Sequence, residues 1–134
     1  MKEDWGKFTQ YHLARLKEGI ECFNAQKYWE CHEALEHVWL EDRDDPARNV
    51  YWAIIQVASA LVHYRESNLV GAKGLINKAK EKFLRCEEQN IETPLLFEKV
   101  DWEEIKKLTF NIGPEPKLED FEALYNFRFK KYDL

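Results

Sequence analysis

The stretch from Pro46 to Glu66 constrains the fold of this 134-residue chain more than any other. Placed at about 100° per residue, it is apolar over nearly its whole circumference, which is typical of a helix buried in the middle of a bundle. Asp45 and Pro46 fit the start of that helix, as an N-cap and a first helical proline. Three polar residues interrupt it at intervals of seven, Asn49, Gln56 and His63. They predict a narrow polar stripe along an otherwise buried helix.

The preceding stretch, Tyr28 to Leu40, has a second unusual polar pair. It predicts an amphipathic helix whose aromatic side we expect to face the core. His32 and Glu36 lie one turn apart on that aromatic side, whereas Glu30 and His37 point away from it. Buried polar groups require partners.

Helices 28–40 and 46–66 are joined by a short loop, so we expect them to pack antiparallel with their polar patches in contact. The predicted cluster between these two helices has four members, His32, Glu36, Gln56 and His63. We expect this cluster to be covered by Trp29, Trp39 and Trp52. Contact between the patches lowers the cost of burying each one.

Several functions fit such a cluster. It is either a hydrogen-bonded network that sets helix packing or a small-ligand pocket with aromatic walls. An alternative is a metal-dependent enzyme of the hydrolase type using His32, Glu36 and His63, and another is a homo-oligomeric interaction module. A zinc-protease HExxH helix is rejected because Glu36 stands where the second histidine is required. The residues identify no cofactor, and we assign no metal.

The whole pattern predicts an all-α fold. We expect one domain over residues 1–134, a bundle of five to six helices with an irregular or extended C-terminal tail. Residues 1–90 form a four-helix core, and residues 91–134 form a short helix plus tail. The other predicted helices are 5–23, 69–88 and 102–110, with one or two helical turns in 118–125. We expect His12 to be a partly exposed surface histidine, residues 41–45 to be a solvated turn, and the tail aromatics to pack on the body or on a second subunit.

The composition limits the classes of binding partner that we expect. A net charge of −5 opposes nonspecific binding to nucleic acid or to an anionic membrane surface. No apolar run reaches the roughly 20 residues of a membrane-spanning helix, and the N-terminus has no apolar signal segment. The three cysteines form no CxxC pair, so we expect reduced thiols in a cytoplasmic protein. The expected partners are a small-molecule ligand or a second subunit in a homodimer.

These motifs resemble the bacterial and archaeal family called domain of unknown function 309. The resemblance covers about residues 8 to 90. It rests on Phe23-Asn24, Tyr28, His32-Glu33, Glu36, Trp39, Gln56-Val57-Ala58, His63, Asn68 and Gly71-Ala72. It implies a small, compact all-helical domain but no activity. It singles out His32, Glu33, Glu36, Trp39, Gln56 and His63, which we take as candidate ligand-binding residues.

Overall fold

The structure of the protein is a computed structural model that describes residues 5–130 and 132. In this part of the chain every regular element is a helix, which confirms the all-α prediction. The elements are α1 (Gln10–Arg15), α2 (Lys17–Asn24), α3 (Tyr28–Glu41), α4 (Arg48–Arg65), α5 (Leu69–Glu88), α6 (Pro94–Lys99), α7 (Trp102–Phe110), the 3₁₀ helix η2 (Leu118–Phe121) and α8 (Glu122–Tyr125). Residues 1–4, on which the absence of a signal segment was argued, lie outside the described residues.

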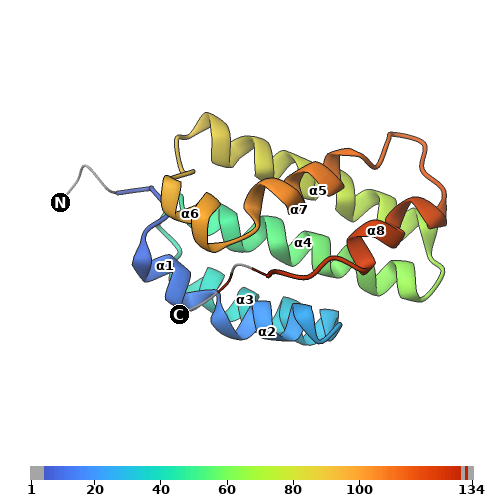
Figure 1. The fold of residues 1–134 in the computed structure, drawn as a ribbon, viewed down its shortest axis with the longest axis horizontal. Helices are drawn as coiled ribbons and strands as arrows, with labels where there is room; N and C mark the ends of the chain where they lie inside the picture. Colours follow the sequence, from blue (N-terminus) through green and yellow to red (C-terminus); the bar gives the residue numbers. More distant parts are fainter. Residues whose placement is uncertain (1–4, 131, 133–134) are drawn as a thin grey trace.

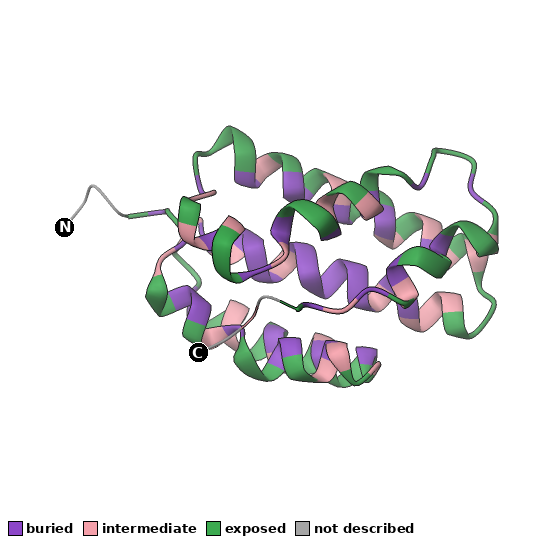
Figure 2. Ribbon diagram, viewed as in Figure 1, coloured by how far each residue is buried: buried purple, intermediate pink, exposed green. Residues whose placement is uncertain are grey.

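Helix α4 is the centre of the bundle, as its apolar sequence predicted. It packs between α3 and α5, and buried positions follow it along its length (Figures 1 and 2). Arg65 at its end lies over the ring of Tyr28 at the start of α3, so α3 and α4 are antiparallel. Since large apolar side chains are withdrawn from water around α4, this helix contributes much of the stabilisation of the fold.

Helix α2 closes one side of α3 at very short range. A Cβ atom at Gly19 would lie 2.4 Å from the side chain of Leu35, which is fully buried. Only glycine therefore permits this close approach of α2 to α3.

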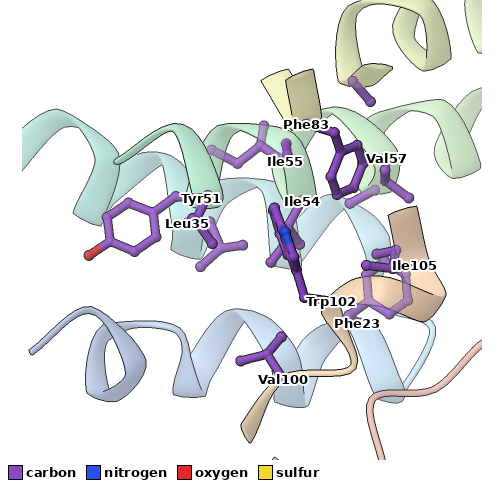
Figure 3. Packing of buried hydrophobic residues seen from close by; sticks show 14 of the residues in the cluster. Phe23, Leu35, Tyr51, Ile54, Ile55, Val57, Phe83, Val100, Trp102 and Ile105 are labelled. Carbon is purple, nitrogen blue, oxygen red and sulfur yellow. The ribbon is translucent and has the colours of Figure 1, made fainter. Parts of the chain in front are cut away.

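Helix α7 covers the other side of the core. The ring of Trp102 is fully buried 4.8 Å from that of Phe83 (Figure 3). Its Nε1 donates to Glu92 at 2.7 Å. Burial of a large ring whose one polar atom is satisfied favours a fixed position for α7 against α5.

The predicted number of five to six helices is wrong, because the described residues form eight α-helices and a 3₁₀ helix. The first predicted helix is divided at Leu16 into α1 and α2. The segment between the predicted helices 69–88 and 102–110 contains α6, in which Thr93 is the N-cap and Pro94 the first residue. Threonine followed by proline ends one helix and begins another equally well, and only the packing of Leu96 into the core distinguishes the two outcomes.

The segment after α8 is extended and packs its aromatics on the body. Phe129 is 4% exposed, and its ring lies 5.1 Å from that of Phe23 on α2. Asn24 brackets Phe129, donating to its carbonyl at 3.0 Å and accepting from its N–H at 2.8 Å. The hydroxyl of Tyr132 donates to the Leu13 carbonyl at 2.8 Å, and burial raises the pKa of Tyr132 to about 12. These contacts confirm the packing predicted for the tail.

Cys22, Cys31 and Cys86 are free, as predicted. None of the helices in residues 5–130 has the length and apolarity needed to span a membrane.

Candidate functional site

His32 lies on the edge of α3, half-buried under an exposed tryptophan. The ring of Trp29 is stacked on the imidazole, with centroids 4.8 Å apart and planes inclined by 15°. Trp29 is itself 54% exposed, so it covers His32 from the solvent side. The Nδ1 atom of His32 is buried and has no hydrogen-bond partner.

The two glutamates of the predicted site are exposed, which corrects the expectation that Glu36 lies in the core. Its carboxylate reaches only to 4.0 Å from His32 Nε2, so the pair makes an ion contact but no hydrogen bond. The core side of α3 is formed by Tyr28, Cys31 and Leu35, and Glu36 is rotated about 100° from Leu35. Glu33 points elsewhere, into a hollow of about 640 Å³ between α2 and α3.

Trp39 and Trp52 join α3 to α4 through their rings. The centroids are 5.0 Å apart, and the planes are inclined by 57°. The guanidinium of Arg48 lies 3.9 Å above Trp39, while the ammonium of Lys82 and the guanidinium of Arg85 lie 4.2 Å and 5.6 Å from the Trp52 centroid. Cations thus contact both tryptophans.

The polar stripe of α4 runs along the same side of the bundle. Gln56 is 7% exposed and its Oε1 has no hydrogen-bond partner. Asn49, about two turns before Gln56 on the same stripe, donates through Nδ2 to the Pro46 carbonyl but leaves its buried Oδ1 unpartnered. The prediction that this stripe is buried is confirmed at Asn49 and Gln56, whereas His63 is only partly buried.

His63 faces α5 at the far end of the stripe. Its Nδ1 lies 3.0 Å from the side-chain nitrogen of Asn68, the N-cap of α5. A Cβ atom at Gly71 would meet that same Nδ1 at 2.6 Å. Glycine at position 71 therefore makes room for the histidine, which is held at the α4–α5 turn.

These positions define what we call the outer face of α3, α4 and α5. Its residues are Trp29, His32, Glu36 and Trp39 on α3, Trp52, Gln56, Ser59 and His63 on α4, and Gly71, Leu75, Lys78, Lys82 and Arg85 on α5. They recur at helical spacing on each helix, and the Trp39–Trp52, Trp52–Lys82 and His63–Gly71 contacts set the three helices in register.

The outer face brings together residues from all three helices but not as the hydrogen-bonded network we expected. His32, Glu36 and Gln56 share the face without a hydrogen bond among them, and His63 pairs with Asn68 instead. Within residues 5–130 no group of three or more His, Cys, Asp or Glu side chains is placed to hold a metal ion. The ligand set His32, Glu36 and His63 is thus not assembled, because His63 is turned toward α5.

A different polar cluster, missed from the sequence, ties α1 to the loop before α4. His12 is 4% exposed, and its Nε2 lies 2.6 Å from Asp45 Oδ2. The N–H of Thr9 donates to the other ring nitrogen at 2.9 Å, so both nitrogens are engaged. The expectation of a surface histidine is wrong because Asp45, a loop residue, supplies the partner that burial requires.

Asp42 is the second centre of this cluster and corrects the prediction of a solvated turn. It accepts from Tyr11 at 2.7 Å and from Tyr51 at 2.8 Å, and Arg15 Nε lies 3.3 Å away. Burial and the bond to Asp42 raise the pKa of Tyr51. The signal available in the sequence was Tyr51 itself, since a phenol on a helix predicted to be buried needs an acceptor.

Comparison with known proteins agrees with the motifs. The family model described as Domain of unknown function (DUF309) matches residues 16–75, a segment that holds all six candidate ligand-binding residues. Residues 16–75 are therefore similar to the family that the motifs resemble.

Over 82 residues the chain is 36% identical to the uncharacterized protein YpuF of Bacillus subtilis (strain 168). The aligned part is 61% of this chain and 47% of that relative, so the chain spans about half the length of the curated relative it matches. No solved structure matches the chain.

Proposed function

We propose that this protein is a non-covalent binding module and that the outer face of α3, α4 and α5 is its binding site. One observation carries the proposal. Five buried side-chain polar atoms in the described part of the chain lack a hydrogen-bond partner, and four of them belong to α3 and α4 beside this face. They are His32 Nδ1, Trp39 Nε1, Asn49 Oδ1 and Gln56 Oε1. The fifth, Arg15 Nε, lies 3.3 Å from the carboxylate of Asp42.

Unpartnered buried polar atoms cost free energy, so their concentration on one face needs a reason. Elsewhere the same fold satisfies such groups, as Tyr51, His12 and Trp102 demonstrate. A face that retains both donors and acceptors without partners is suited to a ligand that supplies them, and the tryptophan rings add apolar contact.

Binding is favoured over catalysis because the histidine and the cysteines that could react are either hydrogen-bonded or held as neutral thiols. Both nitrogens of His12 are engaged, so its pairing with Asp45 leaves no base free for substrate. Burial raises the pKa of Cys31 and of Cys86, which disfavours the thiolate that a nucleophile requires. A pocket-type ligand and a structural role for the cluster were both expected, and the unpartnered atoms favour the ligand.

Replacing Gln56 by methionine tests this proposal without knowledge of the ligand. Methionine fills a similar volume and removes the unpartnered amide, so we expect Gln56→Met to raise the free energy of unfolding of the free protein by about 1 kcal/mol, measured by urea titration. Tyr51→Phe is the matched control. It removes a buried polar group that has a partner and should lower stability by about 1 kcal/mol. A loss of stability in Gln56→Met comparable to that in the control would show a satisfied network and refute the proposal.

A further inference from the structure

The cations of the outer face suggest which ligand it takes. Resting on the proposed function, we propose that the site binds a free small molecule bearing an oxyanion, a carboxylate or a phosphate, which Lys82 and Arg85 hold beside Trp52. The two sources of such a group, a small molecule and the acidic side chains of a second copy, are distinguished by the experiment below.

The first reason is that Lys82 is a buried cation without a carboxylate partner in the described part of the chain. It is 4% exposed, and its ammonium lies 4.2 Å from the centroid of Trp52. Within the described residues neither Lys82 nor Arg85 forms an ion pair with a carboxylate, although Arg85 approaches the same ring. Buried charges are normally paired, and two cations on one ring repel each other. Burial, followed by the charge of Arg85, lowers the pKa of Lys82, while the neighbouring Glu81 opposes this shift.

The tryptophan pair extends the cationic patch across α4. Arg48 lies over Trp39 and donates to its carbonyl at 3.2 Å, which leaves other guanidinium donors available. The indole N–H of Trp39 is a further donor without a partner. Donors and positive charge therefore prevail at this end of the face, in a chain whose net charge is −5.

An oxyanion matches this end of the face better than other ligand classes. Its lone pairs accept from ammonium, guanidinium and indole N–H groups, and its charge offsets that of Lys82 and Arg85. A cationic ligand would add to the repulsion, and a purely apolar one would leave Lys82 unpaired. The single carboxylate of the outer face, Glu36, is 52% exposed at its side chain and lies on α3, where it contacts His32.

The test follows the indole N–H resonances of the five tryptophans by ¹H–¹⁵N NMR, assigned by Trp→Phe variants. Sodium phosphate and sodium citrate are titrated separately at constant ionic strength. We expect saturable shifts at Trp39 and Trp52 with at least one anion. The resonance of Trp102 should stay in place, because its N–H is bonded to Glu92 in the core. The double variant Lys82→Gln/Arg85→Gln should weaken binding at least tenfold.

Lys107→Gln is the matched control, since Lys107 is an exposed lysine on α7 and its loss should leave the affinity within twofold. Unchanged Trp39 and Trp52 resonances in the wild-type protein, or equal binding by the double variant, would overturn the inference. So would a dimer in light scattering that is lost in the double variant while neither anion binds. Gln56→Met reports on the proposed function separately, because its stability gain does not depend on the charge of the ligand.

Discussion

The imidazole of His12 on α1 lies 2.6 Å from the carboxylate of Asp45, in the loop that precedes α4. The backbone N–H of Thr9 donates to Nδ1, so Nδ1 carries no proton and Nε2–H is the donor to Asp45. The other oxygen of Asp45 accepts from the N–H of Ala47. The pair thereby fixes α1 to the start of the central helix, across 33 positions of sequence.

Removal of the His12 imidazole should destabilise the protein. His12→Leu leaves Asp45 without its donor, and we expect the free energy of unfolding to fall by about 2 kcal/mol in urea titration. His37→Leu is the control, because His37 is exposed on α3 and its replacement should change stability by less than about 0.5 kcal/mol. Equal effects of the two variants would mean that the His12–Asp45 pair does not stabilise the fold.

Two glycines of α5 should respond to alanine in opposite directions. The added Cβ at position 71 would meet His63, so Gly71→Ala should cost about 1–2 kcal/mol. Nothing lies within 4 Å of a Cβ at Gly74, and Gly74→Ala should stabilise α5 by about 0.5–1 kcal/mol. Thermal unfolding of both variants measures this contrast. The double variant His63→Ala/Gly71→Ala should recover part of the loss, and a failure to do so would refute the steric cause.

Replacing Lys82 by methionine should stabilise the free protein in a pH-dependent way. Folding lowers the pKa of Lys82 from its ordinary value of 10.5, mainly because the ammonium is buried. The folded state therefore releases this proton first as the pH rises. The cost of the buried charge is full at neutral pH, shrinks as the pH passes through the lowered pKa, and vanishes above 10.5.

We accordingly expect Lys82→Met to add about 1 kcal/mol at pH 7 and progressively less toward pH 10.5, by urea titration of both proteins across that range. Lys78→Met, on the same stripe but exposed, should show no such trend. A gain that grows with pH would reverse the assigned sign.

Asn24 should control whether the C-terminal segment stays docked. Asn24→Ala removes both bonds to the backbone of Phe129, and we expect faster amide exchange at Phe129 with a loss of about 1–2 kcal/mol in stability. Asn77→Ala is the control, since Asn77 is exposed on α5. Unchanged exchange at Phe129 would show that its ring packing alone holds the segment.

Helical periodicity was sufficient to predict the long helices. The 46–66 prediction agrees with α4 at Arg48–Arg65, and the 69–88 prediction agrees with α5 at Leu69–Glu88, because a continuous apolar stripe marks both. Short helices such as α6 were missed, since six residues carry too little periodicity to be recognised before their burial is known.

The placement of the candidate residues could be predicted in part. Spacing placed His32 and Gln56 on stripes that meet, and the structure puts them on one face. The spacing did not predict that Glu36 is exposed, because a single residue step of about 100° moves a side chain from the core to its edge. The sequence pattern did not single out Lys82, although this residue is buried over Trp52.

The amino-acid sequence by itself determined which long segments become helices, which helix is central and which family residues 16–75 are similar to. These properties depend on the order of residues along the chain. Tertiary structure alone decided that His12 meets Asp45, that His63 turns to α5 and that Lys82 and Arg48 approach paired tryptophans. The physical reason is that such contacts depend on the register and rotation of packed helices, which small differences in side-chain shape set.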